Sequence, residues 1–134
     1  MSGELGKPNR AKTWRPRAIP GATDGIVAGE IMAWRAWYWD VKRRKLRSIF
    51  VDYEWPVDGP ATGEPWNGYG IHSFKTKKRV SREYGSIYDM LLVGEVELWG
   101  DVVEFEEGYT SEFARPVTLF GNYAEVAKAT YGLK

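Results

Sequence analysis

Aromatic residues are unusually frequent in this chain of 134 residues: seven tryptophans, eight tyrosines and five phenylalanines make up 15% of it. Each ring buries a large apolar area, so a short chain can build a substantial core around them. The length is typical of one domain. The absence of cysteine excludes disulfides, thiolate metal sites and a cysteine nucleophile. We therefore expect one domain with an aromatic-rich core.

The apolar residues follow a two-residue period that is typical of β-strands. Between residues 28 and 40 both alternating faces are apolar, which predicts a central strand covered on two sides. A polar turn at residues 42–45 predicts a return strand over 46–53. Further strands are predicted over 91–99, 102–105 and 112–120, with a bend or bulge at Gly100.

Two segments have helical signals. A short helix is predicted over residues 77–84, and a C-terminal helix is predicted with Asn122 as its cap and Gly132 as its stop. Its inward face would carry Tyr123, Val126, Ala127, Thr130 and Tyr131. Residues 56–70, rich in proline and glycine, predict a long loop. The expected class is α+β: a compact, strongly twisted antiparallel β core with a mid-chain and a C-terminal helix, forming one domain over residues 25–134.

Residues 1–24 contain three prolines and three glycines without an apolar period, which predicts an extended basic arm, either mobile or held down by Trp14. The net charge of +1 conceals a strong segregation of charges. Cations gather in three sets: Lys7, Arg10, Lys12, Arg15 and Arg17; then Lys42, Arg43, Arg44, Lys45 and Arg47; then Lys75, Lys77, Lys78, Arg79 and Arg82. Residues 83–114 hold nine acids and no base. Such a bipolar chain can steer an anionic partner to one side, although solvated loops would have the same composition.

Several kinds of site are excluded by the residues themselves. His72 is the only histidine, no pair of acids stands at a ligand spacing beside it, and no nucleophile elbow or phosphate-binding glycine loop is present. We therefore expect no metal. No apolar run approaches the roughly 20 residues of a membrane span, and no signal-peptide core follows Met1. We expect a cytoplasmic protein without a membrane partner, or one in a virion or host cytoplasm if it comes from a phage.

Arg35 is the most informative single residue, because it shares a strand face with tryptophans. A buried guanidinium must be paired, stacked or placed at the edge of a pocket, since an unpaired buried charge is costly. One interpretation is an arginine stacked on Trp37 with its head at solvent or on an internal carboxylate. The other is an anion-binding arginine at the base of a cleft.

Three blocks of sequence resemble the pocket segments of ADP-ribosyltransferases. They are Gly68-Tyr69-Gly70-Ile71-His72-Ser73-Phe74, then Ser81-Arg82-Glu83-Tyr84, then Leu91-Leu92-Val93-Gly94-Glu95-Val96-Glu97-Leu98-Trp99-Gly100. Downstream, residues 109–113 are similar to the strand that begins with the family's catalytic glutamate, and residues 34–37 are similar to its first strand. The family's His-Gly pair and Ser-x-Ser signature are missing.

The resemblance implies NAD chemistry at these positions. Glu112 would stabilise the oxocarbenium-like transition state as nicotinamide leaves, and Arg35 would hold the diphosphate. His72 or Tyr84 would stack on the nicotinamide ring, with Ser73 beside them. Glu112 could equally be a solvated acid at a strand end.

A binding protein is the function that we expect, with no cofactor. The basic arm with Trp14 and the two basic loops would hold a nucleic acid or an acidic protein surface, as in a phage or bacterial accessory protein. The acidic stretch 83–114 would then have to face away. The alternative is an NAD-using ADP-ribosyltransferase relative, active or degenerate.

Overall fold

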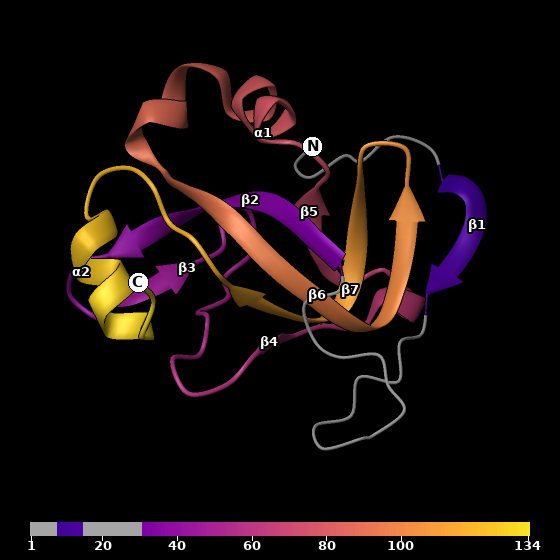
Figure 1. The fold of residues 1–134 in the computed structure, drawn as a ribbon, viewed down its shortest axis with the longest axis horizontal. Helices are drawn as coiled ribbons and strands as arrows, with labels where there is room; N and C mark the ends of the chain where they lie inside the picture. Colours follow the sequence, from indigo (N-terminus) through magenta and orange to yellow (C-terminus); the bar gives the residue numbers. More distant parts are fainter. Residues whose placement is uncertain (1–7, 15–30) are drawn as a thin grey trace.

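The structure is a computed structural model that describes residues 31–134 and the backbone of one further strand, β1 (Pro8–Trp14). An antiparallel, strand-rich sheet closes into a small barrel, with two α-helices outside it (Figure 1). The predicted α+β class is therefore confirmed. The other strands are β2 (Ile31–Asp40), β3 (Lys45–Arg47), β4 (Ala61–Thr62), β5 (Ile71–Phe74), β6 (Leu92–Phe105) and β7 (Gly108–Pro116). The helices are α1 (Lys77–Tyr84) and α2 (Ala124–Tyr131), with 3-10 turns η1 (Pro65–Asn67) and η2 (Gly85–Met90).

Four strands close the barrel. Strand β6 pairs with β2, β2 with β5, β5 with β7, and β7 again with β6. Strand β6 is 14 residues long and pairs with β1, β2 and β7. It bends at Gly100, whose φ is +83° and where the register with β7 shifts. A side chain rarely adopts that conformation, so glycine allows the bulge. The predicted bend or bulge at Gly100 is confirmed.

The core lies on both faces of β2. Ala33 and Trp37 belong to a larger cluster that also holds Leu46 and Trp55, with the Trp37 and Trp55 rings edge to face at 5.3 Å. Ala36 points the other way, into a smaller cluster with residues of α1 and β5. The prediction of a strand covered on two sides is confirmed for the middle of β2.

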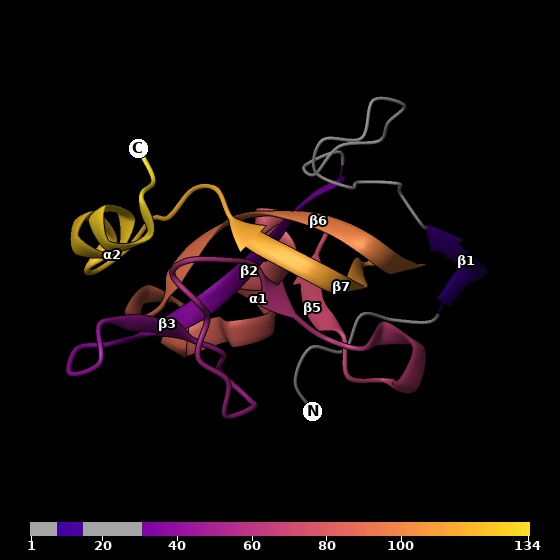
Figure 2. The same ribbon diagram turned by 90° about the horizontal axis from the view of Figure 1, so that it is seen from below.

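The helices lie at different places on the sheet. Helix α1 begins after Thr76, whose hydroxyl accepts a hydrogen bond from the Arg79 N–H, and it covers the smaller cluster. Its bounds are those predicted. Helix α2 lies beside β3 at the end of the barrel opposite β1 (Figures 1 and 2). Tyr131 ties it down: its hydroxyl donates to the Trp55 carbonyl at 2.7 Å and accepts from the Leu46 N–H at 2.8 Å.

Two predicted strands have wrong bounds. The strand predicted over 46–53 ends at Arg47, because the chain turns back so that the Ser48 N–H donates to the Tyr53 carbonyl. The strand predicted over 112–120 lies at 108–116, because residues 106–107 form a tight turn and pairing with β6 resumes at once. Strand β5 lies within a region where periodicity alone predicted no strand.

The predicted cap of the C-terminal helix is also wrong. Tyr123, in the left-handed region with φ of +66°, precedes the first helical residue, and no side chain caps it. Tyr123 is exposed rather than on the inward face, which Ala124 and Ala127 occupy. The stop at Gly132 is confirmed, since its φ of +70° lets its N–H bond back to the last turn.

Residues 1–7 and 15–30 lie outside the described part of the chain, so most of the predicted arm of residues 1–24 does too. Residues Pro8–Trp14 of that arm form β1 and pair with β6 at the edge of the sheet. Among the described residues, no helix combines the length and apolar character needed to cross a bilayer.

Candidate functional site

A pocket of about 330 Å³ opens beside β2. Its walls are two chain segments that are distant in sequence, Ser48–Tyr53 and Gly68–His72. Arg35 reaches it from β2, and Tyr84 from the last residue of α1. Pockets of this size are at the lower end of those that bind small molecules.

The Arg35 guanidinium is fixed by the surrounding fold. Its Nη1 donates to the His72 carbonyl at 2.8 Å, and its Nη2 lies 3.4 Å from the Ser48 hydroxyl. Its Cζ atom lies 4.8 Å from the ring centroid of Trp55 and 5.6 Å from that of Trp37. The stacking that the sequence suggested for Arg35 is therefore present, with Trp55 as the nearer ring.

No acidic side chain pairs with Arg35 within the described residues. Toward the described residues only two of its five N–H groups donate a hydrogen bond, and Nε is buried without an acceptor among them. Burial lowers the pKa of Arg35 from 12.5 to about 10, and the neighbouring Tyr84 hydroxyl opposes this shift. The charged form is thus destabilised where it stands. The internal carboxylate, which the first interpretation allowed as an alternative to solvent, is absent from the described residues around Arg35.

Aromatic side chains form the rim of the pocket. Phe50 stacks on Tyr84 with ring centroids 5.8 Å apart, which joins the first wall to α1. Phe50 and Tyr69 are 56% and 77% exposed, and both line the pocket. His72 is also at the rim, where partial burial and then the charge of Arg35 lower its pKa. His72 is therefore neutral near pH 7.

Local sequence explains both walls. In the first, the Ser48 N–H reaches the Tyr53 carbonyl, and the Tyr53 N–H reaches the Val51 carbonyl, so the chain doubles back. In the second, the 3-10 turn η1 ends at Gly68 with φ of +87° before the chain enters β5. Sequence reasoning missed Ser48 and Trp55 as partners of Arg35. The polar Ser48 and Asp52 within an otherwise strand-like run were the available signal for a turn.

Three of the five residues that the resemblance assigned to NAD line this pocket: Arg35, His72 and Tyr84. Ser73 does not, because it alternates with His72 along β5 and is fully buried. Glu112 does not line it either. Its Oε1 accepts a hydrogen bond of 3.0 Å from the Asp101 N–H and lies over the bulge at Gly100. The structure thus gives Glu112 a role in holding the bulge.

The second basic set surrounds one carboxylate. Arg43, Lys45 and Arg47 all pair with Glu54, at 2.6, 3.8 and 3.3 Å, and Arg47 also pairs with Asp52. The three cations lower the pKa of Glu54, mainly through the Arg43 hydrogen bond. These pairs reduce the positive field that the sequence alone suggests for this loop.

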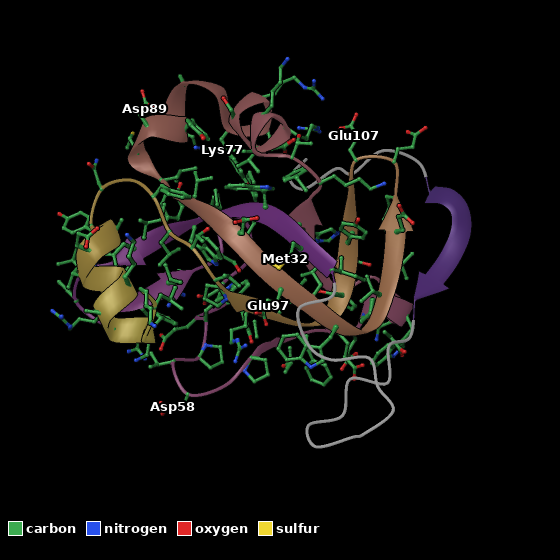
Figure 3. The ribbon with its side chains drawn as sticks, viewed as in Figure 1. Met32, Asp58, Lys77, Asp89, Glu97 and Glu107 are labelled. Atoms are coloured by element: carbon green, nitrogen blue, oxygen red, sulfur yellow. The ribbon has the colours of Figure 1, made fainter. Side chains whose placement is uncertain are left out.

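The third basic set meets the acidic stretch. Lys75 pairs with Glu104 at 2.8 Å, and Arg79 pairs with Glu83 at 2.9 Å and with Glu107. Glu107 lies at the tip of the β6–β7 hairpin, on the side of the molecule that carries α1 (Figure 3). Part of the stretch 83–114 therefore faces this basic set rather than away from it.

The remaining predicted partner residues differ in their surroundings. Lys77 lies over the rings of Trp34 and Phe120, with Nζ 5.8 and 5.0 Å from their centroids. Lys42, Arg44 and Lys78 are exposed and form no ion pair within the described residues. The side chains of the first set, Lys7, Arg10, Lys12, Trp14, Arg15 and Arg17, lie outside the described residues.

Within residues 31–134 no three histidine or acidic side chains gather into a group that could hold a metal ion. Comparisons of the chain with protein-family models, curated proteins and solved structures found no significant match. The resemblance to ADP-ribosyltransferases therefore stays a prediction, carried by the short motifs alone.

Proposed function

We propose that this protein is a binding protein whose site is the Arg35 pocket and whose ligand is a small organic anion. The observation that carries the proposal is the Arg35 guanidinium, which lines the pocket half-buried, with its Nε buried, and has no acidic partner in the described chain. A charge left in this state costs stability, so an anion that enters the pocket would gain the attraction that the fold leaves unused. Strongly perturbed ionisable groups in a cleft also gather at functional sites more often than elsewhere.

The pocket suits a ligand that is anionic at one end and apolar along its body. Its lining is mostly apolar, with Ile49, Phe50 and Val51 on one wall and Ile71 on the other. A few polar groups on an apolar wall are the usual arrangement for holding a small molecule in one orientation.

Nuclear magnetic resonance of the arginine side chains tests the proposal directly. The Nε–H signal of Arg35, identified by its loss in Arg35→Met, should shift saturably when benzoate or phenyl phosphate is added. Arg115→Met is the matched control, because it removes one positive charge at an exposed pair with Glu97, away from the pocket. The control should keep the shift. No change at about 10 mM of either anion, a concentration at which even weak millimolar ligands saturate, would reject the pocket as an anion site.

The exposed cations without acidic partners support a second proposal, that the basic loops hold a nucleic acid or an acidic protein surface. Lys42, Arg44 and Lys78 are available for phosphate contacts in the described chain. Affinity for a single-stranded oligonucleotide should then fall steeply as the salt concentration rises. Replacing Lys42, Arg44 and Lys78 together by alanine should reduce the slope of that salt dependence. A salt-independent or unmeasurable affinity would contradict this proposal without touching the first.

The enzyme alternative predicts NAD binding that depends on Arg35 and nicotinamide release that depends on Glu112. Calorimetry with NAD on the wild type, Arg35→Ala and Glu112→Gln separates these requirements. If no heat appears at millimolar NAD, the cofactor is not a ligand of this pocket. Because Glu112 holds the Gly100 bulge, loss of function in Glu112→Gln counts only if its thermal unfolding is unchanged.

A further inference from the structure

We infer that the ligand of the Arg35 pocket is an aromatic monocarboxylate, an inference that rests on the proposed function and specifies its ligand class. Three observations on the pocket carry it: the charges of its lining, the rings of its walls, and the arrangement of groups around the guanidinium.

The charges of the lining match one negative charge rather than two. Among the described residues that line the pocket, Arg35 is the only cation, and Asp52 brings a carboxylate of its own, which pairs with Arg47 outside the pocket. His72 adds no positive charge near pH 7, because its pKa is lowered. A phosphate monoester carries about −1.5 to −2 at that pH, which is more negative charge than the single guanidinium neutralises. A carboxylate brings one charge and meets one.

The walls of the pocket are aromatic to an unusual degree. Phe50, Tyr53, Tyr69, His72, Phe74 and Tyr84 all line it. Aromatic rings prefer offset-stacked or edge-to-face contacts with other rings, and such pairs are stabilising beyond the apolar area that they bury. The exposed rings of Phe50 and Tyr69 remain available for a flat ligand, since the contact of Phe50 with Tyr84 occupies only one of its faces.

The surroundings of the guanidinium favour a planar acceptor. The two hydrogen bonds of Arg35 and its stacking on Trp55 hold the planar group in place, while its other N–H groups have no acceptor in the described chain. A carboxylate is planar and can accept two parallel N–H bonds from one guanidinium. Helix α1 meets the pocket at Tyr84, its C-terminal residue. That end of a helix carries partial negative charge, which disfavours a dianion further.

Four probes separate the ring, the charge and the kind of anion: benzoate, acetate, benzamide and phenyl phosphate. Each is titrated by calorimetry at constant ionic strength and about pH 7.5, where phenyl phosphate is mostly a dianion. The proteins are the wild type, Arg35→Met, Arg35→Lys and the charge control Arg115→Met. Arg35→Lys keeps the charge but lacks the planar fork, so it stays informative if Arg35→Met folds poorly.

We expect benzoate to bind the wild type and Arg115→Met at least tenfold more tightly than the three other probes. Arg35→Lys should lose about tenfold in benzoate affinity, and Arg35→Met should lose binding altogether. Phenyl phosphate binding as tightly as benzoate, or more tightly, would overturn the monocarboxylate while the proposed anion site stands. Acetate or benzamide binding as tightly as benzoate would overturn the requirement for a ring or for the charge. If no probe shows Arg35-dependent binding, the inference and the proposed function both fall.

Discussion

Replacing Arg35 by methionine should leave the free energy of unfolding nearly unchanged, although the residue lies in the middle of β2. Methionine is flexible and fills irregular apolar space, so it suits the volume beside Trp55. A purely structural arginine at this position would instead be needed for stability. The variant therefore separates a residue kept for binding from one kept for folding.

The expected magnitude follows from opposing contributions. The lowering of the Arg35 pKa from 12.5 to about 10 corresponds to about 3 kcal/mol against the charged form, which the substitution removes. Against this stand the lost hydrogen bond to the His72 carbonyl, about 1.5–3 kcal/mol, and the lost contact with the Trp55 ring, about 0.5–2 kcal/mol. The net change lies between about 1 kcal/mol of stabilisation and 2 kcal/mol of loss.

Urea unfolding at neutral pH, followed by far-ultraviolet circular dichroism, measures this change without relying on the tryptophans beside Arg35. Leu46→Ala is the reference for damage to the core, because Leu46 is fully buried and such truncations cost about 2–5 kcal/mol. Arg35→Met should lie clearly above that reference in stability. A decrease of about 4 kcal/mol or more in the free energy of unfolding would refute the reasoning, since Arg35 would then be required for the stability of the fold.

Three further predictions concern the sheet, α2 and the charge in the pocket. Gly94→Ala should lower the free energy of unfolding by at least about 3 kcal/mol or prevent folding, because the added Cβ would lie 1.7 Å from the Thr118 carbonyl oxygen. Thermal unfolding measures the loss, with Gly59→Ala as the control because the space around Gly59 is open. Tyr131→Phe should lower the free energy of unfolding, measured in urea, by about 2 kcal/mol, because the Tyr131 hydroxyl accepts from the buried Leu46 N–H of β3 and donates to the Trp55 carbonyl. The affinity of the protein for benzoate should fall as the pH rises through about 10, because Arg35 must be charged to hold the anion and the pKa of Arg35 in the unliganded protein is about 10. A flat affinity profile from pH 8 to about 10.5 would contradict that assignment.

The basic sets illustrate how far composition can mislead about a surface. Arg43 and Arg79 are both members of cationic runs in the sequence, yet each forms ion pairs with acids far along the chain, Glu54 and Glu107. The hydrogen bond and the charge of Glu54 raise the pKa of Arg43. Burial lowers the pKa of Arg79, but its hydrogen bonds with Glu107 and Glu83 outweigh that effect and raise it. A run of basic residues in the sequence indicates which side chains reach the surface. The acidic side chains that the fold brings beside them determine how much positive potential the surface keeps.

The sequence alone determined the features that depend on local periodicity and on backbone conformation. Alternating apolar residues predicted β2 and the first part of β6, and the special conformation of glycine predicted the bulge at Gly100 and the stop at Gly132. These sequence signals lie within a few residues of the strand, bulge or helix end that they predict, so the rest of the fold did not alter these local structures.

Only the tertiary structure decided the site. Arg35 donates hydrogen bonds to Ser48, which lies 13 positions along the chain, and to His72, which lies 37 positions along it. Its guanidinium stacks on the ring of Trp55. Glu112, placed by its motif beside Arg35, lies instead at the bulge of β6. A strand pattern reports which face a side chain takes, but not which distant segment covers that face. Whether Arg35 met a carboxylate or an open pocket was therefore decided by the closing of the barrel.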